Sequence, residues 1–187
     1  MPPQIPRKYN PVGIYCRTFV SNRKEGEKLI LHFDGIESCG EIYVNGQFAG
    51  YTEGSFNQSE FDITQLACEG ENQLVVKVLR WCDGSWLEDQ DFFRLSGIFR
   101  DVYLYALPQV HISDYRVDAL LDENYQDGVL RVEVCVEGEA DGCLVQLDLF
   151  NPKGKEILSG IQAEVKDGRA AFEEVVETPW QWSAESP

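Results

Sequence analysis

Short stretches of β-branched and aromatic residues, separated by turn residues, run through almost the whole chain. Such stretches are typical of strands, and here they recur at intervals of about 8–14 residues. No stretch of ten or more residues shows helical periodicity. The pattern predicts an all-β protein built from sandwich-type domains. The expected strands cover 13–20, 28–34, 40–51, 72–81, 102–107, 110–121, 129–136, 144–150, 156–165 and 170–176.

Turn residues divide these strands and suggest where domains meet. Asn45-Gly46 offers two residues that tolerate a positive φ, which predicts a type I′ hairpin turn inside 40–51. Phe61–Leu66 is compatible with one helical turn. Pro108 marks a boundary, so we expect one domain over 1–107 and a second over 108–187.

Charge and cysteine usage exclude several classes of partner. With 32 acidic and 16 basic residues the net charge is −16, which repels nucleic acids and anionic membrane surfaces. No apolar run approaches the roughly 18 residues of a membrane span, and the N-terminus lacks the apolar core of a signal peptide. Cys16, Cys135 and Cys143 lie in apolar runs, where a free thiol behaves as a small hydrophobe. We therefore expect reduced cysteines and a cytoplasmic protein.

Residues 79–102 combine acidic and aromatic side chains more densely than the rest of the chain. Aromatic rings stack on sugars, and carboxylates accept hydrogen bonds from sugar hydroxyls or bind a hard cation. Asp83 and Asp89 also fit turn and helix-cap positions. The side chains concerned are Trp81, Asp83, Trp86, Glu88, Asp89, Asp91, Phe92 and Phe93.

Other catalytic patterns are missing from the sequence. His32 and His111 are the two histidines, and His32, between Leu31 and Phe33, is interpreted as a structural or surface residue. There is no nucleotide-binding or zinc-peptidase motif. Asp89 and Asp91 would share one face of an extended backbone, yet no deep pocket is indicated that would tune one of them as an acid. Independent catalysis by this chain is therefore not expected.

Several stretches resemble the β-galactosidases of glycoside hydrolase family 2. The segment 79–102 is the most specific, since its Leu87-Glu-Asp-Gln-Asp91 matches a family segment that reaches into the active site. The others match the N-P-x-G-x-Y entry to the sugar-binding domain, the core of its jelly roll, and the W-S-A-E-x-P close of the following immunoglobulin-like domain. They are Tyr9–Tyr15, Phe33–Ser38 with Val44–Gly46 and Gly50-Tyr51, and Trp180–Pro187.

The resemblance implies a jelly roll over 1–107, incomplete at its N-terminus, and an immunoglobulin-like sandwich over 108–187, incomplete at its C-terminus. Trp180 and Trp182, two residues apart, are expected on one strand face in the core of the second domain. The parent would be a retaining β-galactosidase, often a homo-oligomer, whose catalytic barrel carries two glutamates. Neither glutamate signature occurs here, so the chain alone is expected to be inactive.

The resemblance also assigns site residues. Asn10 would bond a hydroxyl of the galactoside substrate. Asp91 would accept hydrogen bonds from galactosyl hydroxyls and help to hold a sodium ion, with water excluded by Phe92 and Phe93. A magnesium ion elsewhere in the parent is also compatible with the family. Two alternatives remain open: a non-catalytic carbohydrate-binding module, and a structural pair of sandwiches without a ligand.

Overall fold

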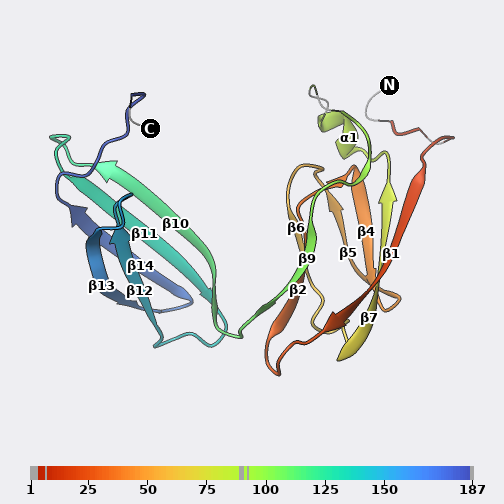
Figure 1. Ribbon diagram of the computed structural model, residues 1–187, viewed down its shortest axis with the longest axis horizontal. Helices are drawn as coiled ribbons and strands as arrows, with labels where there is room; N and C mark the ends of the chain where they lie inside the picture. Colours follow the sequence, from red (N-terminus) through yellow and green to blue (C-terminus); the bar gives the residue numbers. More distant parts are fainter. Residues whose placement is uncertain (1–3, 7, 89–90, 92, 186–187) are drawn as a thin grey trace. The chain divides into compact units, whose positions relative to one another are not determined.

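The computed structural model describes residues 4–6, 8–88, 91 and 93–185 (Figure 1). These residues form an all-β protein with one four-residue helix, α1 (Gly84–Leu87), so the predicted fold class is confirmed. The chain divides into two compact units, Met1–Pro108 and Gln109–Pro187. Within the described ranges, no helix has the length and apolar character needed to cross a membrane.

The first unit is a sandwich of two main antiparallel sheets. One sheet has the order β1-β7-β4-β5 and the other the order β6-β2-β9, while β3 and β8 form a short separate ladder. The strands are β1 (Val12–Ser21), β2 (Lys28–Phe33), β3 (Ile36–Glu37), β4 (Cys39–Val44), β5 (Gln47–Glu53), β6 (Ser59–Asp62), β7 (Gly70–Leu79), β8 (Gly97–Ile98) and β9 (Val102–Leu107).

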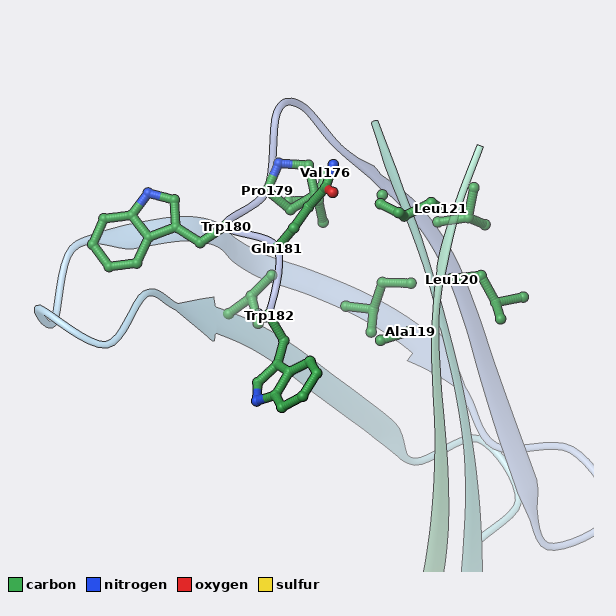
Figure 2. A pocket seen from close by; sticks show the side chains of 12 residues that line it. Ala119, Leu120, Leu121, Val176, Pro179, Trp180, Gln181 and Trp182 are labelled. Carbon is green, nitrogen blue, oxygen red and sulfur yellow. The ribbon is translucent and has the colours of Figure 1, made fainter. Parts of the chain in front are cut away.

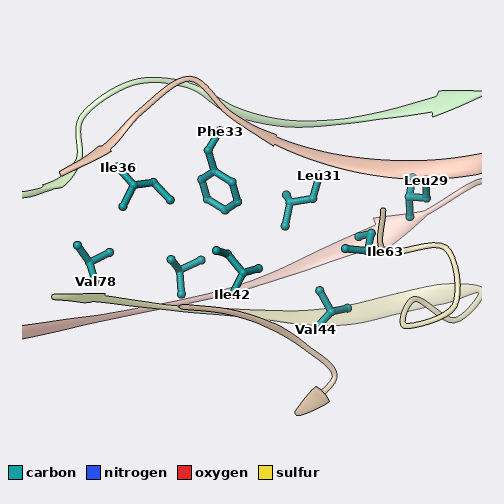
Figure 3. Packing of buried hydrophobic residues seen from close by; sticks show 9 residues of the cluster. Leu29, Leu31, Phe33, Ile36, Ile42, Val44, Ile63 and Val78 are labelled. Atoms are coloured by element: carbon teal, nitrogen blue, oxygen red, sulfur yellow. The ribbon is translucent and has the colours of Figure 1, made fainter. Parts of the chain in front are cut away.

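Apolar side chains from both sheets form the core of this unit (Figure 3). Leu31 and Phe33 project from β2 toward Ile42 and Val44 on β4, as the two-residue period of a strand requires. Phe33, Ile42 and Val44 are each 0% exposed. β2 lies in the middle of its sheet, between β6 and β9, and its residues 29–33 are all buried.

The histidine of β2 is a structural residue, as interpreted from the sequence. His32 is 3% exposed. Its Nδ1 lies 2.8 Å from a Glu60 carboxylate oxygen, and its Nε2 lies 2.8 Å from an Asp34 oxygen. The ring also stacks on Tyr103 at a centroid distance of 4.4 Å. Both ring nitrogens are thus partnered, which is what burial of a polar group requires.

Two local predictions in this unit had different outcomes. The β4–β5 hairpin turns at Asn45 (φ 50°) and Gly46 (φ 76°), which confirms the positive-φ turn. The helical turn expected over 61–66 is wrong in its first half, because residues 61 and 62 belong to β6 and pair with β2. A single turn follows, in which the N–H groups of Leu66 and Ala67 both donate to the Ile63 carbonyl. Packing of Phe61 edge-on against Phe33 accounts for the strand.

The second unit has a three-stranded sheet, β10-β11-β14, and a two-stranded sheet, β12-β13. On β11, Leu130, Val132, Val134 and Val136 alternate inward and form the core with Phe172 and their neighbours. The strands are β10 (His111–Leu121), β11 (Gly128–Glu137), β12 (Leu144–Phe150), β13 (Glu156–Glu164) and β14 (Arg169–Val176).

The expected burial of Trp180 and Trp182 is wrong. Their exposed fractions are 63% and 76%, and they lie beyond the end of β14 in chain without regular structure. Thr178 has a φ of 43° and Pro179 follows it, so the strand does not continue and its two-residue period no longer applies.

All six cysteines are free, but they are not buried where the sequence suggested. Cys16 and Cys143 are exposed, and Cys135 is half-buried. The two buried thiols are Cys39 and Cys82, which the sequence did not single out.

The core of the first unit should depend strongly on Phe33. We expect Phe33→Ala to lower the free energy of unfolding of this unit by about 3–5 kcal/mol, since the site is fully enclosed and a cavity would remain. Phe93→Ala is the matched control, because Phe93 is 88% exposed, and it should change stability by less than about 0.5 kcal/mol. Denaturant unfolding followed by circular dichroism would measure both. Equal losses for the two variants would contradict this account of the core.

Candidate functional site

The acidic and aromatic segment crosses from one sheet of the first unit to the other. It leaves the end of β7, forms α1, and returns through β8 to β9, which belongs to the opposite sheet. Figure 1 shows α1 at the end of the sandwich where β7 ends and β9 begins. Asp83 is the N-cap of α1 and its side chain accepts from the Gly84 N–H, so its interpretation as a cap residue is confirmed. Asp89, Gln90 and Phe92 lie outside the described residues.

Asn10 fixes the start of this segment. Its Nδ2 donates to the Trp81 carbonyl at 2.9 Å, and its Oδ1 accepts from the Trp81 N–H at 2.9 Å. The side chain thus pairs with the backbone in the way a neighbouring strand would. Asn10 precedes β1, and Trp81 follows β7, the partner of β1. The structure therefore brings Asn10 to the base of the segment that carries Asp91.

Glu88 fixes the far end of α1. One carboxylate oxygen accepts from the Ser55 N–H at 2.7 Å, and the other accepts from the Ser55 hydroxyl at 2.7 Å. Ser55 is 1% exposed, so these bonds satisfy polar groups that water does not reach. Hydrogen bonds to a charged acceptor are the stronger kind. The Glu88 side chain therefore holds the chain three residues before Asp91.

The return of the segment is held by a buried glutamate and an arginine. Glu37, 8% exposed, accepts from the Ser96 N–H at 3.1 Å. Arg94 donates to the Ser85 carbonyl at 2.8 Å, and its guanidinium lies 5.9 Å from the centre of the Trp81 ring. These contacts tie residues after Asp91 back to α1 and to β3.

Aromatic rings in this segment serve mainly to pack it. The rings of Trp81 and Trp86 stack on each other with an interplanar angle of 17°. Three shielded polar atoms without a hydrogen-bond partner among the described residues also occur here: Arg80 Nε, Trp86 Nε1 and Ser96 Oγ. Unsatisfied buried polar groups are rare and often accompany functional sites.

Asp91 itself is exposed. The Phe93 side chain is 88% exposed in this chain, so the exclusion of water from Asp91 in the parent stays a prediction. An exposed carboxylate can accept hydrogen bonds from sugar hydroxyls or contribute oxygen ligands to a hard cation. It offers one ligand residue, and the described part of the chain contributes no grouping of three metal-ligand atoms that includes it.

The contacts of Ser55, Glu37 and Glu88 were not foreseen from the sequence. Glu88 belongs to the acidic stretch, but its partner lies 33 residues away, and Glu37 and Ser96 are 59 residues apart. No pattern within a short stretch of sequence indicates a hydrogen bond between residues so far apart. Asn10, in contrast, was singled out by its motif, although its bonds to the Trp81 backbone were not predicted.

A second candidate surface is an apolar groove of about 440 Å³ in the second unit. Figure 2 shows the segment with Pro179, Trp180, Gln181 and Trp182 beside the end of β10 that carries Ala119 and Leu121. Exposed tryptophan rings are suited to stacking on a flat apolar surface or a sugar ring. Within the described lining, the polar side-chain groups are the Gln181 amide and the indole N–H groups of Trp180 and Trp182, and the Gln181 Nε2 already donates to the Tyr125 carbonyl. The groove is therefore poor in groups that recognise hydroxyls.

Comparison with known proteins agrees with the fold and with the motifs. The sugar-binding domain of the glycosyl hydrolases family 2 matches residues 1–108. The β-galactosidase of Priestia megaterium is 45% identical over 195 residues, which cover 100% of this chain and 19% of that protein. The β-galactosidase of Kluyveromyces lactis is 40% identical, with coverage of 97% of this chain and 20% of that protein.

Solved structures show the same fold. The β-glucuronidase of Bifidobacterium dentium, in complex with coumarin-3-O-glucuronide, superposes with a TM-score of 0.81 at 22% identity, over 95% of this chain and 35% of that one. A β-glucuronidase of Bacteroides uniformis gives a TM-score of 0.79 at 22% identity, over 98% of this chain and 25% of that one. The chain thus spans about a fifth of the length of its β-galactosidase relatives. It belongs to glycosyl hydrolase family 2 and contains the sugar-binding domain of that family.

Proposed function

We propose that this chain is the N-terminal part of a β-galactosidase that removes terminal β-D-galactosyl residues from lactose-type substrates. The observation that carries the proposal is sequence identity of about 40% or more, along the whole chain, with relatives named β-galactosidase. The solved structures named above are β-glucuronidases, but at 22% identity they bear on the fold and not on the substrate.

In this proposal the chemistry takes place in another part of the parent. Retaining hydrolysis needs two carboxyl groups about 5 Å apart across the scissile bond, one as nucleophile and one as acid and base. We assign these roles to two glutamates of a catalytic barrel, as the family resemblance implies. The large unmatched share of the relatives leaves room for such a domain. The present chain would support the barrel and complete its galactose subsite.

Asp91 would provide the main contribution of this chain to that subsite. Its carboxylate is exposed, yet the segment on either side of it is anchored at Trp81, Glu88 and Ser96. A group held in this way can meet a ligand with little loss of conformational entropy. When docked against the barrel, the carboxylate would accept hydrogen bonds from galactosyl hydroxyls.

Asn10 would bind substrate at the same subsite and would also hold the base of the segment. Its Nδ2 group carries two hydrogens, and the bond to the Trp81 carbonyl uses one of them. The other is suited to a sugar hydroxyl. Substitution of Asn10 would then remove a substrate contact and loosen the base of the segment at once.

A sodium ion fits Asp91 as one oxygen ligand of a site whose remaining ligands come from the barrel. The bound ion would supply positive charge that offsets the Asp91 carboxylate once water is excluded. Magnesium elsewhere in the parent, a homo-oligomeric parent and a cytoplasmic location also belong to the proposal. The free thiols of all six cysteines are compatible with that location.

The role of Asp91 can be tested in the intact parent enzyme. We expect Asp91→Asn to lower kcat/KM by roughly two to three decades, about 3–4 kcal/mol, and to weaken the dependence of activity on sodium. The amide keeps the shape but loses the charge that a hard cation and charge-assisted hydrogen bonds require. Steady-state kinetics across a sodium series would measure both effects.

Asp141→Asn is the matched control for this experiment. Asp141 is an exposed aspartate of the second unit, so its replacement should leave kcat/KM and the sodium response unchanged. If Asp91→Asn behaved like this control, the carboxylate would be a surface turn residue and the proposed subsite would be wrong.

The chain by itself should not hydrolyse galactosides, because both proposed catalytic glutamates lie elsewhere. We expect no turnover of a nitrophenyl galactoside above the background rate, and galactose binding with a Kd in the mM range or weaker. Calorimetry and a chromogenic assay on the purified chain would check this. Micromolar galactose binding without turnover would favour the alternative of a carbohydrate-binding module. Turnover that is proportional to protein and lost in Asp91→Ala would overturn the division of roles.

A further inference from the structure

A buried thiol and two carboxylates meet beside the start of α1. Cys39 begins β4, and its partner across the hairpin is Glu53 at the end of β5. Cys82 and Asp83 immediately precede α1. The Sγ of Cys82 and one carboxylate oxygen each of Glu53 and Asp83 all lie within 4.8 Å of one another. The three donors come from two segments about 30 residues apart in sequence, so only the fold brings them together.

Cys82 is the buried donor of this group, and Glu53 and Asp83 are exposed. The Cys82 side chain lies with that of Cys39 among the buried residues of the unit, at 6% and 2% exposure. The Cys82 sulfur lies 3.7 Å from the Ser85 hydroxyl oxygen. A cysteine binds a metal ion as its thiolate.

The space between these donors is open because residue 84 is glycine. A Cβ at this position would lie 2.8 Å from a Glu53 carboxylate oxygen and 3.5 Å from the Cys82 sulfur. Any side chain here would therefore occupy the gap between carboxylate and thiol. The Tyr51 hydroxyl donates to the other Glu53 oxygen and orients the carboxylate, as outer-shell partners of metal ligands do.

The mixed donor set selects the type of ion. Sodium and magnesium prefer oxygen ligands alone, whereas thiolates favour zinc, monovalent copper and iron–sulfur clusters. Zinc accepts cysteine and carboxylate ligands together, in tetrahedral groups of four. We propose that Cys82, Glu53 and Asp83 form a binding site for one Zn²⁺ ion, with a water molecule as the fourth ligand. The proposal is independent of the sugar subsite and of the parent's activity.

Such an ion would join the end of the β4–β5 hairpin to the start of the segment that carries Asp91. Three protein ligands would leave the fourth tetrahedral position to water. Because Cys82 would bind as a thiolate, binding would release a proton and weaken as the pH falls.

The test uses the reduced, chelator-treated chain, titrated with zinc chloride in a calorimeter. We expect one Zn²⁺ per chain and a higher unfolding temperature when zinc is present. Cobalt chloride serves as a spectroscopic probe, and a thiolate-to-cobalt charge-transfer band should appear at the same stoichiometry. Native mass spectrometry would report whether the ion stays bound to the folded chain.

Two variants report on different ligand types. Glu53→Gln changes an exposed side chain and should leave the fold intact, while Cys82→Ser places a hydroxyl where the thiol was. Each should weaken zinc binding by more than about 100-fold, since loss of an outer-shell partner alone costs about 10–100-fold. Cys143→Ser and Glu123→Gln are matched controls with exposed side chains in the second unit, and neither should change the affinity or the cobalt band.

Three results would overturn the proposal. One is failure of the reduced, folded chain to bind zinc at micromolar concentration. Another is stoichiometric binding that persists unchanged in both Glu53→Gln and Cys82→Ser. The third is a Cys39–Cys82 disulfide in the purified chain that re-forms after reduction even with zinc in excess, since Cys82 would then be part of a redox element and not a metal ligand.

Discussion

Packing of β2 against β4 and β7 is the constraint on which the first unit depends. Leu31 and Phe33 on one sheet meet Ile42, Val44 and Val76 on the other, and none of these side chains is more than 1% exposed. Close packing of this kind leaves the strand ends little freedom to move. The candidate site is built on the ends of these strands, so the precision of the site follows from the apolar core beneath it.

Polar contacts then shape the long segment that crosses between the sheets. Asn10 replaces a missing strand partner at Trp81, Glu88 bonds both polar groups of Ser55, and Glu37 holds the Ser96 backbone. In each case a side chain supplies the hydrogen bond that regular structure would otherwise provide. These contacts anchor the described parts of the segment before and after Asp91.

By themselves, the described groups of this segment would supply only part of the proposed sugar site. Its anchoring groups are used internally, and Asp91 and Phe93 face solvent. A single exposed carboxylate and one ring make few contacts with a sugar, and the ordering cost of binding offsets most of what they contribute. Membership of glycosyl hydrolase family 2, and the much greater length of the relatives, are consistent with a site completed by other domains.

Strands, the Asn45-Gly46 turn and the cap at Asp83 could all be predicted from the sequence, because alternation and turn chemistry are local properties. The family motifs also led to Asn10 and to the segment around Asp91. The predictions that failed depend on residues that are distant in sequence. Residues 61 and 62 form a strand because they pair with β2. Trp180 and Trp182 are exposed because the chain leaves the sheet before them. The pairs Asn10–Trp81 and Glu88–Ser55 were decided by the tertiary structure alone. Their partners are 33–71 residues apart, and no local pattern records a contact over such a separation.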